Sequence, residues 1–276
     1  MKVYIISYLP DELELRQKRL AYHTRQLQWL RNWHNDLHIT VCAQNYTQAE
    51  LQHNLVDEYY QRPKIGVSKA RNVLLEQFYS SDEDWCLFMD DDSILYDNER
   101  HVDTPNFVNK FFSYDLTNID AFWPIDPSRW PTAQLNTQGQ LDDWYKLVGV
   151  DHLKTSFWFY RNTKKFYNQE LYFDESLRHG TDGEFALKLL TNNRSLYIIQ
   201  NIKLKELGKD HSTLANSEFE DRNEANNVIR KYLKQKYDYD HNKRKVFYNR
   251  NWPQHAHETV TLAKESQKTT YSDLFT

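Results

Sequence analysis

The stretch Trp85-Cys86-Leu87-Phe88-Met89-Asp90-Asp91-Asp92-Ser93 joins a short apolar run to three consecutive aspartates. The apolar run is typical of a buried strand. Like charges that lie side by side repel one another unless positive charge lies among them. A divalent cation is the source of positive charge that we expect first, because clusters of carboxylate oxygens select hard cations such as Mg²⁺ or Mn²⁺. The alternative is a solvated acidic turn that caps the next helix.

Strands and helices alternate on the N-terminal side of this stretch. The sequence predicts strands at 3–8, 37–42 and 85–89, and helices at 13–33, 49–59 and from Gly66 to about Phe78. This order predicts an α/β fold with an open, mostly parallel sheet and helices on both faces. Ligands bind beyond the carboxyl ends of the strands in such sheets, where the aspartates stand. Further strands are expected at 146–160 and 195–204, and a helix at 183–190.

Length and charge divide the chain into two parts. Its 276 residues suit one large α/β domain with an appendage, or two small domains. The net charge of -4 does not indicate a nucleic-acid binder, but residues 230–250 carry eight basic groups against two acidic ones, a local balance of +6. We therefore expect a domain at 1–219 and a basic, helical or irregular C-terminal extension at 220–276 that packs on it.

The N-terminal apolar stretch is too short for a signal peptide or a membrane span. We therefore expect a cytoplasmic protein that does not enter a membrane. Cys42 and Cys86 lie in strand-like apolar runs, and we expect both to be buried thiols, not disulfide partners or metal ligands.

The stretch Gly66-Val67-Ser68-Lys69-Ala70-Arg71-Asn72 is the start of a predicted helix. Ser68 is the expected N-cap, which puts Lys69 and Arg71 in the first turn. Cations there oppose the helix dipole unless an anion occupies the site, so this turn could hold a diphosphate. The alternative is that both side chains simply face solvent.

A second carboxylate cluster lies between Phe173 and Leu189. Thr181 and Glu184 have the spacing of a capping box, which is the ordinary role of such residues at a helix start. Asp182 is then free to point forward from the helix and could act as a general base. His211 follows in a polar loop, where a histidine is usually just exposed.

Together these motifs resemble those of nucleotide-sugar glycosyltransferases of the GT-A fold, over about residues 1 to 215. The family order is matched by Ser7-Tyr8-Leu9-Pro10 after the first strand, by Gly66 to Asn72, by the metal motif Asp90 to Asp92, and by Thr181-Asp182 in place of a Glu-Asp base motif. Thr181 stands where the family usually has Glu, so the catalytic assignment rests on Asp182, with Glu184 as the fallback. More narrowly, the chain is similar to T-even phage glycosyltransferases that modify hydroxymethylcytosine in DNA.

The resemblance implies a GT-A type, Rossmann-like fold and an inverting hexosyltransferase that uses a UDP-sugar, with Mn²⁺ or Mg²⁺ as cofactor. The implied residues are Asp182 as the catalytic base; Asp92, His211 and Asp90 as metal ligands; and Tyr8, Lys69, Arg71, Asp90 and Asp91 as contacts to the donor.

For the acceptor, the resemblance implies glucosylated hydroxymethylcytosine in double-stranded phage DNA, modified in the host cytoplasm with glucose as the donor sugar. Trp123 and Trp130 are candidates to stack on the acceptor, and Lys243 and Arg244 to contact its phosphates. Packing in a core or a loop is the alternative for either tryptophan. Two other functions stay open: transfer to a surface polysaccharide or lipid-linked saccharide, and a non-enzymatic DNA- or metal-binding accessory protein.

Overall fold

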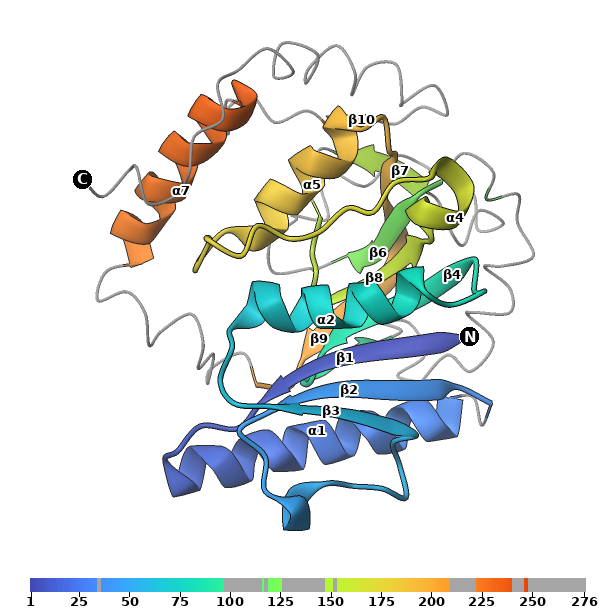
Figure 1. Ribbon diagram of the computed structural model, residues 1–276, viewed down its shortest axis with the longest axis vertical. Helices are drawn as coiled ribbons and strands as arrows, with labels where there is room; N and C mark the ends of the chain where they lie inside the picture. The colour runs from blue at the N-terminus through green and yellow to red at the C-terminus, as the bar shows by residue number, and fades with distance from the viewer. Residues whose placement is uncertain are drawn as a thin grey trace.

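The computed structural model of the protein describes residues 1–33, 36–96, 116, 119–125, 147–150, 153–208, 222–239 and 246–247 (Figure 1). These residues form one sheet with helices on both of its faces. The strands are β1 (Lys2–Tyr8), β2 (His38–Gln44), β3 (Glu58–Arg62), β4 (Trp85–Asp90), β5 (Ser93–Tyr96), β6 (Ala121–Ile125), β7 (Leu147–Val150), β8 (Phe157–Arg161), β9 (Leu196–Glu206) and β10 (Val246–Phe247). The helices are α1 (Leu13–Trp33), α2 (Val67–Tyr79), α4 (Thr163–Tyr167), α5 (Thr181–Thr191) and α7 (Arg222–Tyr237), with a 3₁₀ turn η1 (Gln48–Glu50).

The sheet has the strand order β10-β7-β9-β6-β8-β4-β1-β2-β3, and β5 pairs with β9 outside this path. The four strands β3-β2-β1-β4 are parallel, and Ile5 of β1 faces Val41 on one side and Met89 on the other. The pairings make β1 to β4, β6, β9 and β10 run in one direction, whereas β5, β7 and β8 run in the opposite one. The predicted α/β fold with a mostly parallel central sheet flanked by helices is confirmed.

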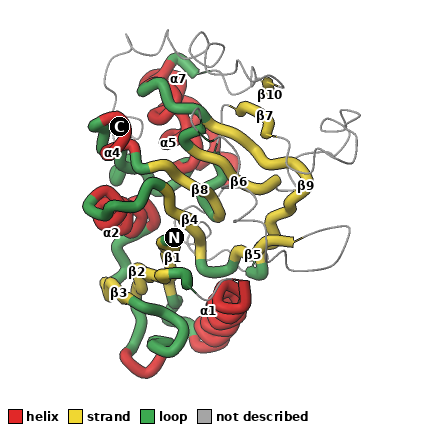
Figure 2. The backbone as a smooth tube through the Cα atoms, turned by 90° about the vertical axis from the view of Figure 1, so that its right-hand side faces the viewer, coloured by secondary structure: helices red, strands yellow, loops and turns green. Residues whose placement is uncertain are grey.

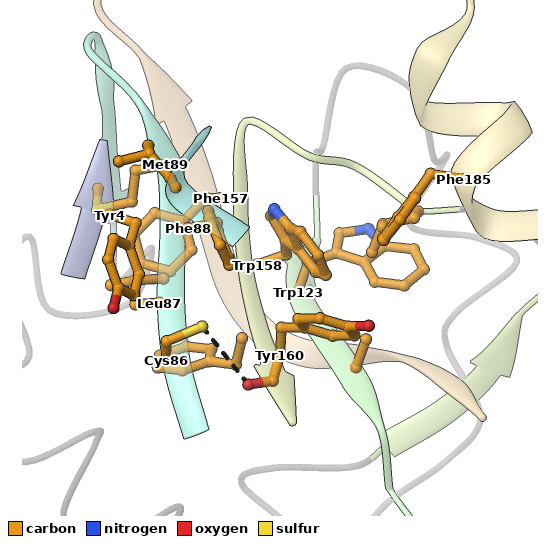
Figure 3. Close-up of a cluster of buried hydrophobic side chains, with 14 of the residues drawn as sticks. Tyr4, Cys86, Leu87, Phe88, Met89, Trp123, Phe157, Trp158, Tyr160 and Phe185 are labelled. Carbon is orange, nitrogen blue, oxygen red and sulfur yellow. Dashed lines mark hydrogen bonds between the residues drawn. The ribbon is translucent and has the colours of Figure 1, made fainter. Parts of the chain in front are cut away.

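Helices cover the sheet on both sides: α1 lies on one face, and α2 and α4 lie on the other (Figure 2). Buried aromatic side chains fill the space between the sheet and its helices. Figure 3 shows Trp158 of β8 between Phe88 of β4 and Phe185 of α5, with ring centroids 5.1 and 5.7 Å away, respectively. The helix α5, which carries Asp182, is therefore anchored to the strand that ends at the aspartates.

The predicted state of the two cysteines is confirmed, whereas the helix predicted at 49–59 is wrong. Cys42 and Cys86 are buried free thiols. The helix predicted at 49–59 does not form. Thr47 and Glu50 close a capping box around a single 3₁₀ turn, and the chain leaves it at Leu51 in an extended conformation. The segment then runs into β3, whose residues Tyr59 and Tyr60 pair with β2, since aromatic residues favour strands.

None of the helices in the described segments is both long and apolar enough to cross a membrane.

An ion pair joins α1 to the connection that follows β2. Arg16 holds Glu50 through two hydrogen bonds, Nε to Oε1 at 2.6 Å and Nη2 to Oε2 at 2.7 Å. The same guanidinium donates to the carbonyl oxygens of Pro10 and Asn45, at 3.1 and 2.6 Å. The hydrogen bonds from Arg16 lower the pKa of Glu50 from its ordinary value of 4.5 to about 2.

We expect Glu50→Gln to lower the free energy of unfolding by about 1 to 2 kcal/mol at pH 7. Because the pKa of Glu50 is lower in the folded state, its contribution is fully present above about pH 4.5 and is lost as the pH falls toward 2. Urea unfolding of both proteins across this range measures the difference, which should narrow with acidification. Glu14→Gln, which removes an exposed pair with Lys18, is the control and should change stability much less. An equal loss in both variants would contradict the assignment.

Candidate active site

The three aspartates lie at the carboxyl end of β4, next to the carboxyl end of β1. Asp90 ends β4 opposite Ile6, and the chain turns through Asp91 and Asp92 into β5. The Asp90 amide donates to the carbonyl oxygen of Ser156 at 3.0 Å, just before β8. The turn is thus held between β1 and β8, at the edge of the sheet where the sequence predicts a ligand site.

Asp91 is an internal residue. Its side chain is 2% exposed, and it accepts hydrogen bonds from Ser7 of β1 and from Arg19 of α1. The Tyr46 hydroxyl in turn contacts the Ser7 hydroxyl at 2.5 Å. This burial contradicts the predicted contact of Asp91 with a donor, because its two carboxylate oxygens are committed to side chains of the protein.

Arg71 connects the two carboxylate motifs. Its side chain is 5% exposed and donates to Asp90 Oδ1 at 3.0 Å and to Asp182 Oδ1 at 3.2 Å. The guanidinium also lies 5.2 Å from the centre of the Phe173 ring. Residues 90 and 182, far apart in sequence, therefore belong to one site. The alternative that Arg71 is merely a solvent-facing residue is wrong.

The start of α2 differs from the prediction. Gly66, with a φ of 88°, is the N-cap, whereas Ser68 is buried within the first turn. Glycine suits this position because other residues rarely adopt a positive φ. Gln44 accepts from the Gly66 amide at 3.0 Å, which fixes the turn to β2. Lys69 remains exposed at the helix start.

Tyr8 lies at the end of β1 on the same edge of the sheet. It is 8% exposed, and the Lys64 ammonium lies 5.2 Å from the centre of its ring.

Asp182 lies in the first turn of α5 and is accessible. Its side chain is 41% exposed, and its Oδ1 accepts from Thr155 as well as from Arg71. Gly180, in a left-handed conformation with a φ of 70°, is the N-cap of the helix. The predicted capping box of Thr181 and Glu184 is therefore wrong.

Glu184 is fully buried under α7. It accepts from the Tyr237 hydroxyl at 2.6 Å and from the Lys236 ammonium at 3.0 Å. This position excludes Glu184 as the fallback base, because its carboxylate faces the helix contact and not the site. The same contact buries Ile229 of α7 directly against Gly180.

Two carboxyl groups of the acidic turn have raised pKa values. Loss of solvent raises the pKa of Asp90 to about 7, although Arg71 opposes the shift. Loss of solvent and the neighbouring Asp91 likewise raise the pKa of Asp92 to about 6, against the effect of Arg19. Among the described residues, Arg19 and Arg71 form the printed ion pairs with Asp90, Asp91 and Asp92. When the three aspartates are ionised, their formal charge of -3 exceeds the +2 of the two guanidinium groups, and a divalent cation at the turn would add positive charge.

The donor set suits such a cation in part. Asp90 and Asp92 offer carboxylate oxygens from a single turn, as hard cations prefer. Among the described residues, no three His, Cys, Asp or Glu side chains converge as a ready-made metal site. Mg²⁺ commonly shares its coordination between protein carboxylates and substrate phosphates.

The site also contains residues that the sequence motifs do not indicate: Arg19, Thr155, and the pair of Lys154 with Glu206, whose side-chain atoms are 2.8 Å apart. The signal for Arg19 lies in the helix itself. Arg19, His23 and Gln26 have helical spacing and form a polar stripe on one face of α1.

One predicted residue, Trp123, lies in the core, and four others cannot be placed relative to this site. His211, Trp130, Lys243 and Arg244 lie outside the described residues. Trp123 is 1% exposed and lies in the core shown in Figure 3. Its burial contradicts a stacking role on an acceptor and supports the alternative of core packing.

Comparisons with known proteins reveal partial structural likeness. A scan of family models finds no match, and neither does a search of curated proteins. The galactosyltransferase LgtC in complex with donor and acceptor sugar analogs is similar at 14% identity and a TM-score of 0.36, over 61% of this chain and 60% of that chain. GalNAc-T7 with UDP, GalNAc and Mn²⁺ is similar at 10% identity and a TM-score of 0.45, over 75% of this chain and 43% of that chain. A197 from STIV is similar at 16% identity and a TM-score of 0.39, over 75% of this chain and 85% of that chain. This chain thus spans less than two thirds of the LgtC and GalNAc-T7 chains.

We expect Gly180→Ala to lower the free energy of unfolding by about 2 kcal/mol or more, because a side chain there is strained at positive φ and meets a packed neighbour. An added Cβ would lie 2.2 Å from Ile229 Cγ1. Gly183→Ala is the matched control: its Cβ would lie 3.6 Å from Leu233, an ordinary contact, and alanine favours a helix by up to about 1 kcal/mol. Denaturant unfolding compares the two, and equal stabilities would refute the close packing of α7 on α5.

Proposed function

We propose that the protein is an inverting, metal-dependent glycosyltransferase that transfers a sugar from a UDP-sugar. The observation that carries this proposal is the assembly in which Arg71 joins Asp90 of the acidic turn to Asp182 at the start of α5. One carboxylate group suited to a cation and one accessible carboxylate suited to a base then face the same edge of the sheet, where ligands of α/β proteins bind.

On the donor side, Asp90 and Asp92 would hold Mn²⁺ or Mg²⁺ at the diphosphate, together with His211 as a further proposed ligand. A bound cation would stabilise the charge that develops on the leaving diphosphate. Lys69 is exposed at the start of α2 and would add positive charge beside the phosphates. Tyr8 would contact the uracil, and Arg71 would stabilise the phosphates from between the two carboxylates.

On the acceptor side, Asp182 would take the proton from the attacking hydroxyl. As the acceptor oxygen bonds to the anomeric carbon, the bond from that carbon to the diphosphate oxygen breaks and UDP leaves. Thr155 and Arg71 both hold Oδ1 of Asp182, which fixes the orientation of a base that is 41% exposed. A positioned general base contributes about 10²- to 10⁴-fold in rate.

For the substrates, we propose glucose as the donor sugar and glucosylated hydroxymethylcytosine in DNA as the acceptor. This finer proposal rests on the motif resemblance and on the basic C-terminal segment. Within that segment, Arg230 and Lys231 of α7 are exposed, whereas Lys236 is paired with Asp174 and Glu184, at 2.9 and 3.0 Å. Fewer basic groups are therefore open to DNA than the sequence suggests, and a saccharide acceptor is the second candidate.

We expect Asp182→Asn to lower the rate of sugar transfer at least about 10²-fold, because the amide cannot accept the proton. Binding of UDP in the presence of Mn²⁺ should persist, since Asp182 is not a proposed metal ligand. Transfer kinetics and calorimetry measure the two effects. Asp82→Asn, at an exposed position away from the site, is the control. Undiminished turnover in Asp182→Asn would remove this residue from the mechanism.

The acceptor is tested by mass spectrometry of hydroxymethylated and glucosylated DNA, and of oligosaccharides, after incubation with a panel of UDP-sugars. We expect added hexose on glucosylated DNA. Combined Arg230→Ala and Lys231→Ala changes should weaken DNA binding and reduce its salt dependence, by about one unit of slope for each lost phosphate contact. Transfer to oligosaccharides alone would select the saccharide acceptor, and an absence of transfer to both classes would favour a non-enzymatic protein.

A further inference from the structure

The helix α1 buries a polar stripe against the acidic turn. Arg19, His23 and Gln26 are 9%, 0% and 0% exposed, although a helix normally turns apolar residues inward. Their spacing of four and three residues places them on one face of the helix. A buried polar face is costly unless its side chains make specific contacts. The contacts of Gln26 and Arg19 therefore indicate what this face of α1 does.

Gln26 holds the main chain of the turn. Its Nε2 donates to the carbonyl oxygen of Asp90 at 2.6 Å and to that of Ser93 at 2.7 Å. These two carbonyls flank Asp91 and Asp92, so a single amide group fixes both ends of the turn.

Arg19 holds the carboxylates of the turn. Its guanidinium donates to Asp91 Oδ1 and, through Nη1 at 2.8 Å, to Asp92 Oδ2. Burial lowers the pKa of His23, one turn further along, to about 4, so this imidazole is neutral near neutral pH. Arg19 is thus the cation that the polar stripe of α1 brings to the aspartates.

The end of β9 closes over this contact. The Leu207 amide donates to the carbonyl oxygen of Asp92 at 2.7 Å. A Cβ added at Gly208 would lie 2.8 Å from Asp92 Oδ2 and 2.9 Å from Arg19 Nη1. The pair of Arg19 and Asp92 therefore lies in close contact with the segment that follows β9.

We propose that Arg19 is a positioning residue for the cation site: its planar fork fixes Asp91 and Asp92 relative to each other and sets the orientation in which Asp92 binds a divalent cation. This inference rests on the proposed function, because it concerns the same turn. A fork that grips two carboxylates at once cannot be replaced by a lysine, which is a point charge on a flexible stem. Residues that orient metal ligands typically affect metal affinity by about 10- to 100-fold.

The test is the affinity for Mn²⁺ in the presence of UDP, measured by the electron paramagnetic resonance signal of free Mn²⁺. We expect Arg19→Lys, which keeps the charge, to weaken Mn²⁺ binding about tenfold or more. If Arg19 only stabilised the fold, the melting temperature would fall and the affinity would not change. If the charge of Arg19 merely repelled the cation, the looser contact of lysine with the carboxylates would increase the affinity for Mn²⁺. Either result would overturn the proposal.

Gly208→Ala tests the same contact without changing any charge and covers the case in which Arg19→Lys fails to fold. Its Cβ should displace Arg19 from Asp92 and weaken Mn²⁺ binding in the same direction, whereas Gly183→Ala should not. Unchanged affinity in Gly208→Ala would count against the proposal.

Asp92→Asn separates this inference from the proposed function. If the unmodified protein binds Mn²⁺ with UDP and Asp92→Asn does not, the cation site stands, and the variants at 19 and 208 decide the role of Arg19 alone. If the unmodified protein binds no Mn²⁺, the metal-dependent function and the inference built on it both fail.

Discussion

Charge compensation at the carboxyl end of β4 is the constraint on which this structure depends. Three consecutive aspartates lie there, at the point where the buried strand β4 ends, and burying an uncompensated charge is very costly. Arg19 of α1 and Arg71 of α2 supply positive charge from opposite faces of the sheet (Figure 2). The acidic turn thus ties the two helical layers to each other, because each layer contributes one of the arginines.

The three aspartates, although adjacent, have different environments. The exposed fractions of their side chains are 31% for Asp90, 2% for Asp91 and 14% for Asp92. Asp91 points inward to Ser7 and Arg19 and anchors the turn to β1 and α1. Burial raises the pKa of both neighbours, to about 7 for Asp90 and about 6 for Asp92. The turn therefore combines one structural carboxylate, Asp91, with the two that the proposed cation would use.

Much of the fold could be predicted because its signals are local. The continuous apolar runs of β1 and β4 and the helical spacing in α1 and α2 depend on neighbours in sequence. The helix predicted at 49–59 failed because its capping box closes only one 3₁₀ turn before β3 pairs with β2. Arg19 was missed because the contact with Asp91 spans 72 residues. From sequence alone, a polar stripe on a helix predicts a solvent-facing surface, because the partner that buries it is distant in the sequence.

The contacts of the C-terminal helix α7 could not be predicted from the sequence either. The basic residues of 230–250 suggested a surface for a polyanion, yet Lys236 is drawn inward by Asp174 and Glu184. Its pairing explains why Glu184 can be fully buried at the start of α5, and Ile229 explains why Gly180 must be a glycine. Since Asp182 lies between these two positions, the placement of the proposed base depends on α7 as well as on Arg71. A segment that looks like an appendage in the sequence thus supports the geometry of the candidate active site.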